Sequence, residues 1–99
     1  MIYEIAQIEV KEGQEAQFEA GAREAVALFK RAKGCHSMRI DRSVEKPQHY
    51  TLVVVWETIE DHMIHFRESA DFQSWRALVG PHFAAPPQVE HMNTVIEGF

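Results

Sequence analysis

The sequence contains a single cysteine, Cys35, so no disulfide can form within one chain. Such sparing use of cysteine is typical of a reducing compartment. Residues 1–4 lack the positive and then apolar regions of a signal peptide, and no run approaches about 18 apolar residues. We therefore expect a cytoplasmic protein in which Cys35 is a small buried apolar side chain.

Basic residues are also scarce, because 10 Lys and Arg stand against 15 Asp and Glu, for a net charge of -5. Nucleic acids and anionic membranes are bound by clusters of positive charge, and this chain has none. We expect neither as a partner. The length of 99 residues suits one domain, residues 1–99, because domains typically run from about 50 to 200 residues.

The first half of the chain alternates between two hydrophobic periods. Residues 2–10 follow the period of two that is typical of a strand, with one face formed by Ile2, Ala6, Ile8 and Val10 and the other by Tyr3 and Ile5. Residues 14–33 follow a helical period and end at Gly34; their apolar stripe consists of Phe18, Ala22, Ala25, Val26 and Phe29.

Two further strands are predicted at residues 35–43 and 49–57, joined by a hairpin loop at 44–48. In the first of them His36, Met38 and Ile40 share one face. The second is apolar on both faces, with Tyr50, Leu52, Val54 and Trp56 on one and Thr51, Val53 and Val55 on the other. Both faces of this strand therefore need cover.

A helix in two segments follows. Thr58 is a good N-cap, and the predicted buried side of the first segment consists of Ile59, Met63 and Phe66. Ser69 caps the second segment, which ends at Gly80-Pro81 and buries Phe72, Trp75 and Val79. A stiff apolar loop at 83–87 leads to a last predicted strand at 88–96.

The order β-α-β-β-α-β predicts an α+β domain of ferredoxin-like topology, with a four-stranded antiparallel sheet and both helices on one face. The other face of the sheet is then open. Because strand 49–57 is apolar on both sides, we expect a second copy of the sheet to cover it, giving a homodimer.

Several residues together resemble the antibiotic biosynthesis monooxygenase family. They are Gly13, Gly34-Cys35-His36, the stretch Val55-Trp56-Glu57-Thr58-Ile59, His65 nine residues after the Trp, and then Ser69, Phe72 and Trp75. The resemblance covers nearly the whole chain. It implies a dimeric α+β barrel that oxidises quinols or polyketide anthrones with molecular oxygen, without metal or flavin.

A related branch of these proteins degrades haem with a His on the second helix, a Trp at the end of the third strand and an Asn on the first strand. His65 and Trp56 match two of these positions. The first strand has Gln7 where the Asn is expected. The resemblance therefore leaves haem binding as an alternative.

Oxygenation without a cofactor requires a dry pocket, a base for a phenolic or enolic proton, and donors that stabilise the resulting anion. We assign the base to His65, because imidazole titrates near neutrality, and expect Trp56 to line the pocket with its indole N–H on a substrate oxygen. Weaker candidates for contacts with the substrate are Phe66, Phe72, His36, Tyr50 and Gln7.

Each candidate also has a purely structural interpretation. Trp56 and the two Phe residues can be core aromatics, and His65 can pair with Asp61 one helical turn away. His36, Tyr50 and His91 can be polar groups with local partners. His62 and His65 have a spacing that can seat a metal, but no third ligand is apparent, so we expect no metal site.

The sequence thus predicts a cofactor-independent monooxygenase acting on a hydroquinone or polyketide-like aromatic. The alternatives are a non-catalytic dimeric barrel that binds a small aromatic, and a haem-binding or haem-degrading protein.

Overall fold

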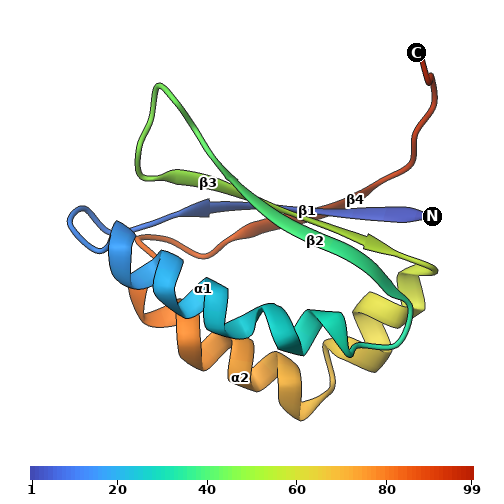
Figure 1. Ribbon diagram of the computed structural model, residues 1–99, viewed down its shortest axis with the longest axis horizontal. Coiled ribbons are helices and arrows are strands. Elements are labelled where there is room, and N and C mark those ends of the chain that lie inside the picture. The colour runs from blue at the N-terminus through green and yellow to red at the C-terminus, as the bar shows by residue number, and fades with distance from the viewer.

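The computed structural model describes all 99 residues and has the predicted element order (Figure 1). The strands are β1 (Ile2–Glu9), β2 (Cys35–Arg42), β3 (His49–Trp56) and β4 (Gln88–Met92). The helices are α1 (Glu15–Lys30) and α2 (Ala70–Val79), with a π-helical segment η1 (Asp61–Phe66) before α2 and a 3-10 turn η2 (Gly80–His82) after it. None of the helices is long and apolar enough to cross a membrane.

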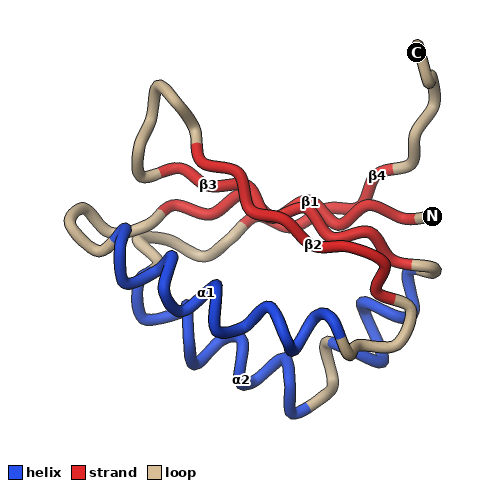
Figure 2. The backbone as a smooth tube through the Cα atoms, viewed as in Figure 1, coloured by secondary structure: helices blue, strands red, loops and turns tan.

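The four strands form one antiparallel sheet in the order β2-β3-β1-β4. Figures 1 and 2 show both helices on one side of this sheet, while the β2–β3 loop and the C-terminal segment extend on the other. The predicted ferredoxin-like topology is therefore confirmed. β1 and β3 are the central strands, so residues on their inner face are covered by neighbours on every side.

The main core lies between the sheet and the helices. The inner face of β1 and the stripe of α1 are buried as predicted, although Val26 of that stripe is 44% exposed. All four inner residues of β3 are buried as well: Tyr50, Leu52, Val54 and Trp56. This packing fixes which residues of the central strands face the helices.

Three element boundaries differ from the prediction. α1 ends at Lys30 rather than Lys33, and a tight turn leads to Gly34 at φ +75°. The first segment of the second helix is π-helical, with a hydrogen bond from the Arg67 N–H to the His62 carbonyl five residues earlier. β4 ends at Met92, which lies opposite Tyr3, rather than at Ile96, so Ile2 of β1 has no partner on β4.

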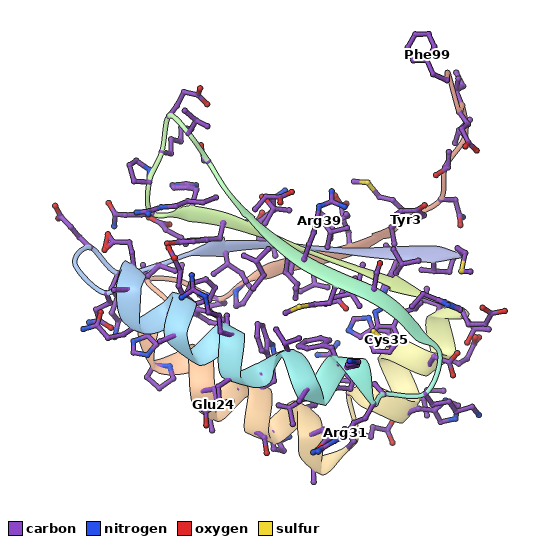
Figure 3. All side chains as sticks on the ribbon, in the orientation of Figure 1. Tyr3, Glu24, Arg31, Cys35, Arg39 and Phe99 are labelled. Atoms are coloured by element: carbon purple, nitrogen blue, oxygen red, sulfur yellow. The ribbon has the colours of Figure 1, made fainter.

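The face of the sheet that points away from the helices has an apolar centre. Ile5 of β1 lies opposite Val53 of β3, and Tyr3 lies between Val55 and Met92. Polar side chains such as Arg39, which points away from the helices in Figure 3, surround this centre. Nothing in the single chain covers it.

Candidate active site

A cavity of about 1360 Å³ lies between the inner face of the sheet and the second helix. The sheet contributes Glu4, Ala6, Ile8 and Leu52 to its wall, and the helical side contributes His62, Phe72 and Trp75. The loop of residues 83–87 closes one side with apolar side chains. The wall thus combines an apolar part with several polar and charged side chains, and such a mixture can hold a small ligand and fix its orientation.

Two polar side chains of the wall, Glu4 and His62, form a cluster with Trp56 and His91, which are not part of the wall. The Trp56 indole N–H donates to Glu4 Oε1 at 2.9 Å, and the same oxygen lies 3.2 Å from His62 Nε2. His62 Nδ1 in turn lies 2.7 Å from His91 Nε2. The Trp56 and His62 rings are also stacked, with their centroids 5.4 Å apart and their planes 17° from parallel.

Strand register brings these residues together. Glu4 shares the inner face of β1 with Ala6 and Ile8, and the register of β4 sets His91 directly opposite Glu4. Trp56 is the last residue of β3, on the other side of β1. His62, in the first turn of η1, covers this corner of the sheet.

Burial sets the charges of the ionisable side chains in this cluster. It raises the pKa of Glu4 to about 7, although the hydrogen bond from Trp56 acts in the opposite direction. Burial also lowers the pKa of His62 to about 4, assisted by the charges of His91 and Arg67. The pKa of His91 is lowered by burial too. Near neutral pH both histidines are therefore uncharged, and Glu4 is poised between its acid and its carboxylate.

The hydrogen bond between His62 and His91 has two proton arrangements. Either His62 Nδ1–H donates to His91 Nε2, or His91 Nε2–H donates to His62 Nδ1. His62 Nε2, 3.2 Å from Glu4 Oε1, carries no proton in the first arrangement and carries one in the second. Passing a proton from Glu4 through His62 would leave His91 protonated on both nitrogens, which its lowered pKa opposes. Glu4 is therefore the member of this cluster that can gain or lose a proton near neutral pH.

Of the residues predicted from the sequence, Phe72 lines the cavity and Trp56 lies directly behind its wall. The Trp56 N–H, which we expected on a substrate oxygen, is bonded to Glu4 instead. Phe66 is a core residue, packed between the rings of Trp56 and Phe29. The position of Phe66 therefore matches the structural interpretation, in which this residue is a core aromatic.

The other four predicted residues lie outside the cavity. His65 has a half-exposed side chain, 3.0 Å from Asp61 Oδ1, and the hydrogen bond with His65 lowers the pKa of Asp61. A bulge between Cys35 and Ser37 leaves His36 exposed beside Glu57, so it does not face the cavity. The two remaining residues are bonded elsewhere: Tyr50 donates to Glu19 Oε2, and Gln7, on the outer face, accepts from Thr51.

The sequence analysis did not single out Glu4, and considered His62 only as a metal ligand. Glu4 had a visible signal, because it is a charged residue in phase with the apolar face of Ile2, Ala6 and Ile8. His62 lies four residues before the buried Phe66, on the same side of the segment. No group of three or more His, Cys, Asp or Glu side chains is arranged to hold a metal ion.

The residues that match the haem-degrading branch do not meet in one place. Trp56 is buried on the inner side of the sheet, Gln7 lies on the outer side, and His65 is turned toward Asp61. These three side chains therefore do not form a haem site, and no step below involves haem.

Comparison with known proteins agrees with this architecture. The chain is 59% identical to a candidate antibiotic biosynthesis monooxygenase from Bordetella bronchiseptica, with a TM-score of 0.93 over 96% of this chain and 97% of the other. A structure from Nitrosomonas europaea shares the fold, with a TM-score of 0.83 at 23% identity over 97% of this chain and 100% of the other.

An uncharacterised protein of Bacillus subtilis, YczJ, is 37% identical over 96% of this chain and its own full length. The sequence pattern described as antibiotic biosynthesis monooxygenase matches residues 1–78. With its fold, its cavity and these similarities in agreement, the chain belongs to the antibiotic biosynthesis monooxygenase family.

Proposed function

We propose that this protein is a cofactor-independent monooxygenase that oxidises a hydroquinone or polyketide-like aromatic with molecular oxygen. The observation that carries the proposal is the buried Glu4–His62 pair on the wall of a cavity that is also lined by apolar side chains of the sheet and of residues 83–87. A pKa of about 7 for Glu4 suits a group that must accept and return a proton at neutral pH. Family membership supports the same class of reaction.

The reaction begins when Glu4, coupled to His62, accepts the phenolic or enolic proton of the substrate. The resulting carbanion gives one electron to oxygen, and the two radicals combine to form a carbon–oxygen bond. Loss of the remaining proton on that carbon, with cleavage of the O–O bond, leaves a carbonyl group and releases water. One oxygen atom enters the product, the other forms water, and the substrate supplies all the electrons.

The chain's own residues have separate tasks in this scheme. Glu4 holds the proton beside His62, and His91 fixes the position of the His62 ring through their hydrogen bond. Trp56 orients Glu4 through its indole N–H. The apolar wall excludes water, which strengthens the charge interactions that stabilise the substrate anion. The assignment of the base to His65 stays a prediction, but its position outside the cavity favours the Glu4–His62 pair.

We further propose that the enzyme works as a homodimer through the open face of the sheet. This face carries Ile5 and Val55 at its centre and has no cover within one chain. A second sheet packed against it would remove this apolar surface from water.

Oxygen uptake tests the proposed reaction. Metal-free protein is supplied with a panel of dihydroxynaphthalenes and anthrones, and the wild type is compared with Glu4→Gln and His62→Ala. His36→Ala serves as the matched control, because that histidine is exposed and bound only to Glu57. We expect saturable uptake that both site variants abolish and the control retains. Ligand binding with no uptake above autoxidation would indicate a binding protein instead.

A further inference from the structure

Two arginines line the cavity without an acidic partner. Arg67 follows the last residue of η1, and Arg76 lies in the last turn of α2. Both residues are exposed, and the only side-chain hydrogen bond of Arg67 is a 3.9 Å contact with Met63 Sδ. No carboxylate lies within 4.0 Å of either guanidinium group.

The surrounding sequence explains why both remain unpaired. The positions three and four residues from Arg76 along α2 hold no acid: they are Phe72, Gln73, Val79 and Gly80. Asp71 lies four residues after Arg67, but both of its oxygens are bound by Arg31, at 2.8 and 2.7 Å. Figure 3 shows Arg31 at the end of α1, beside the start of α2. Asp71, the acid at helical spacing from Arg67, is therefore already bound in an ion pair between the two helices.

The cavity wall thus differs in charge from the rest of the protein. The chain as a whole carries -5, whereas the charged wall consists of the two arginines and Glu4. Because burial raises the pKa of Glu4 to about 7, this carboxyl group offsets the arginines only partly near neutral pH. The positive charge of Arg67 also lowers the pKa of His62, so it acts on the cluster formed by Glu4 and His62. A cleft with a positive wall concentrates anions.

From this arrangement we propose that the substrate is an aromatic acid, whose carboxylate is held by Arg67 and Arg76 while its phenolic end faces Glu4 and His62. The inference rests on the proposed function for the reacting end, but it concerns the opposite end of the ligand. Guanidinium groups match the planar shape of a carboxylate and bind it through two hydrogen bonds. The apolar wall between the two polar ends accommodates the ring system.

The proposal is tested by calorimetric titration with two matched ligands, 2-naphthol and 6-hydroxy-2-naphthoate. They share the ring and the phenol and differ in the carboxylate. We expect the acid to bind the wild type about tenfold more tightly than the naphthol, a typical effect of a charge-assisted hydrogen bond. Arg67→Gln and Arg76→Gln should each reduce this preference and leave naphthol binding unchanged.

Arg23→Gln is the control, since this arginine is exposed on α1 and pairs with Glu19 outside the cavity. It should leave both affinities unchanged. Equal affinity for the two ligands, or an equal loss for both in the Arg67 and Arg76 variants, would overturn the proposal. The experiment consumes no oxygen, so it is independent of catalysis. An acid preference that depends on these arginines in a protein without oxygen uptake would uphold the ligand class and refute the reaction.

Discussion

The Trp56 indole N–H and the Glu4 carboxyl group form a buried hydrogen bond of 2.9 Å between the two central strands. Burial raises the pKa of Glu4, and this hydrogen bond acts against that rise, since it favours the carboxylate. The result is a pKa of about 7. Burial therefore sets the direction of the pKa shift of Glu4, and Trp56, which does not reach the cavity, limits its size.

Replacing Trp56 with Phe removes the donor and keeps most of the ring. We expect the pKa of Glu4 to rise above its wild-type value of about 7, because burial is then less opposed. The pH at which oxygen uptake is half-maximal should move upward with it. The unfolding free energy should fall by about 1–3 kcal/mol, the usual cost of a lost buried hydrogen bond. An unchanged pH profile would contradict a role for Glu4 as the base.

Glu4 also makes stability depend on pH. Its pKa is 4.5 when unfolded and about 7 when folded, so the folded state holds more protons between these values. The unfolding free energy therefore falls as the pH rises through this window, by an amount on the order of 3 kcal/mol. Glu4→Gln lacks this loss, and its amide can keep the contacts with Trp56 and His62.

His62 contributes the opposite slope, because its pKa falls from 6.5 to about 4 on folding, so stability rises with pH between these values. The clean measurement is therefore the difference in urea-unfolding free energy between wild type and Glu4→Gln at pH 5 and pH 8. We expect the wild type to lose stability relative to the variant over this range. A difference that does not vary with pH would show that Glu4 is not buried in its neutral form.

The two neighbouring histidines should behave differently. His62 faces the cavity, whereas the side chain of His65 is half-exposed and paired with Asp61. We expect His62→Ala to reduce oxygen uptake by about 100-fold or more, as the loss of general acid–base catalysis typically does. His65→Ala should retain most of the activity and lose little stability. The reverse result would return the base to His65 and remove His62 from the mechanism.

The turn at Gly34 supports the site from behind. Gly34 has φ +75°, and a Cβ at this position would overlap the carboxylate of Asp61, the residue before His62. Gly13 has a similar φ of +86° but open space around it. We expect Gly13→Ala to cost about 1–2 kcal/mol from backbone strain alone and Gly34→Ala distinctly more. Urea unfolding of both variants measures the difference, and equal losses would mean that Asp61 moves aside freely.

The proposed dimer is tested by sedimentation equilibrium at micromolar concentration. Val55→Lys places a charge on the uncovered face of the sheet and should give a monomer. Val26→Lys is the matched control, since Val26 is exposed on α1, a helix that lies on the other side of the sheet from the uncovered face (Figure 1). A monomeric mass for the wild type would disprove the dimer.

The fold was predictable because its patterns are simple and local. The period of two in β1 and β3 and the helical period of α1 predicted most of the residues that face the core, but Val26 is exposed and Ile2 is only half-buried. Ser69 caps α2 as predicted, with its hydroxyl accepting from the Phe72 N–H. The end of β4 was predicted too late, because the apolar pattern continues to Ile96 while pairing with β1 stops at Met92.

The site was harder to predict because it depends on departures from regular structure. The wide π-helical turn of η1 buries His62 and leaves Ile59 40% exposed, whereas regular helical spacing favoured Ile59 and Met63. A bulge turned His36 outward in a similar way. Glu4 could be recognised only by a different argument. Burying a charged group costs free energy, so an acid within an apolar strand face indicates a special role.

The cost of burying Glu4 also bears on how this fold could evolve. A carboxyl group in a central strand is a poor choice for stability alone, and a leucine at position 4 would pack against Ala6 and Val54 without any need for a proton. Under the proposed function, a lineage that abandoned the reaction would gain by such a replacement. On that proposal, the acid at position 4 is a marker that separates active descendants of this fold from those that keep only its shape.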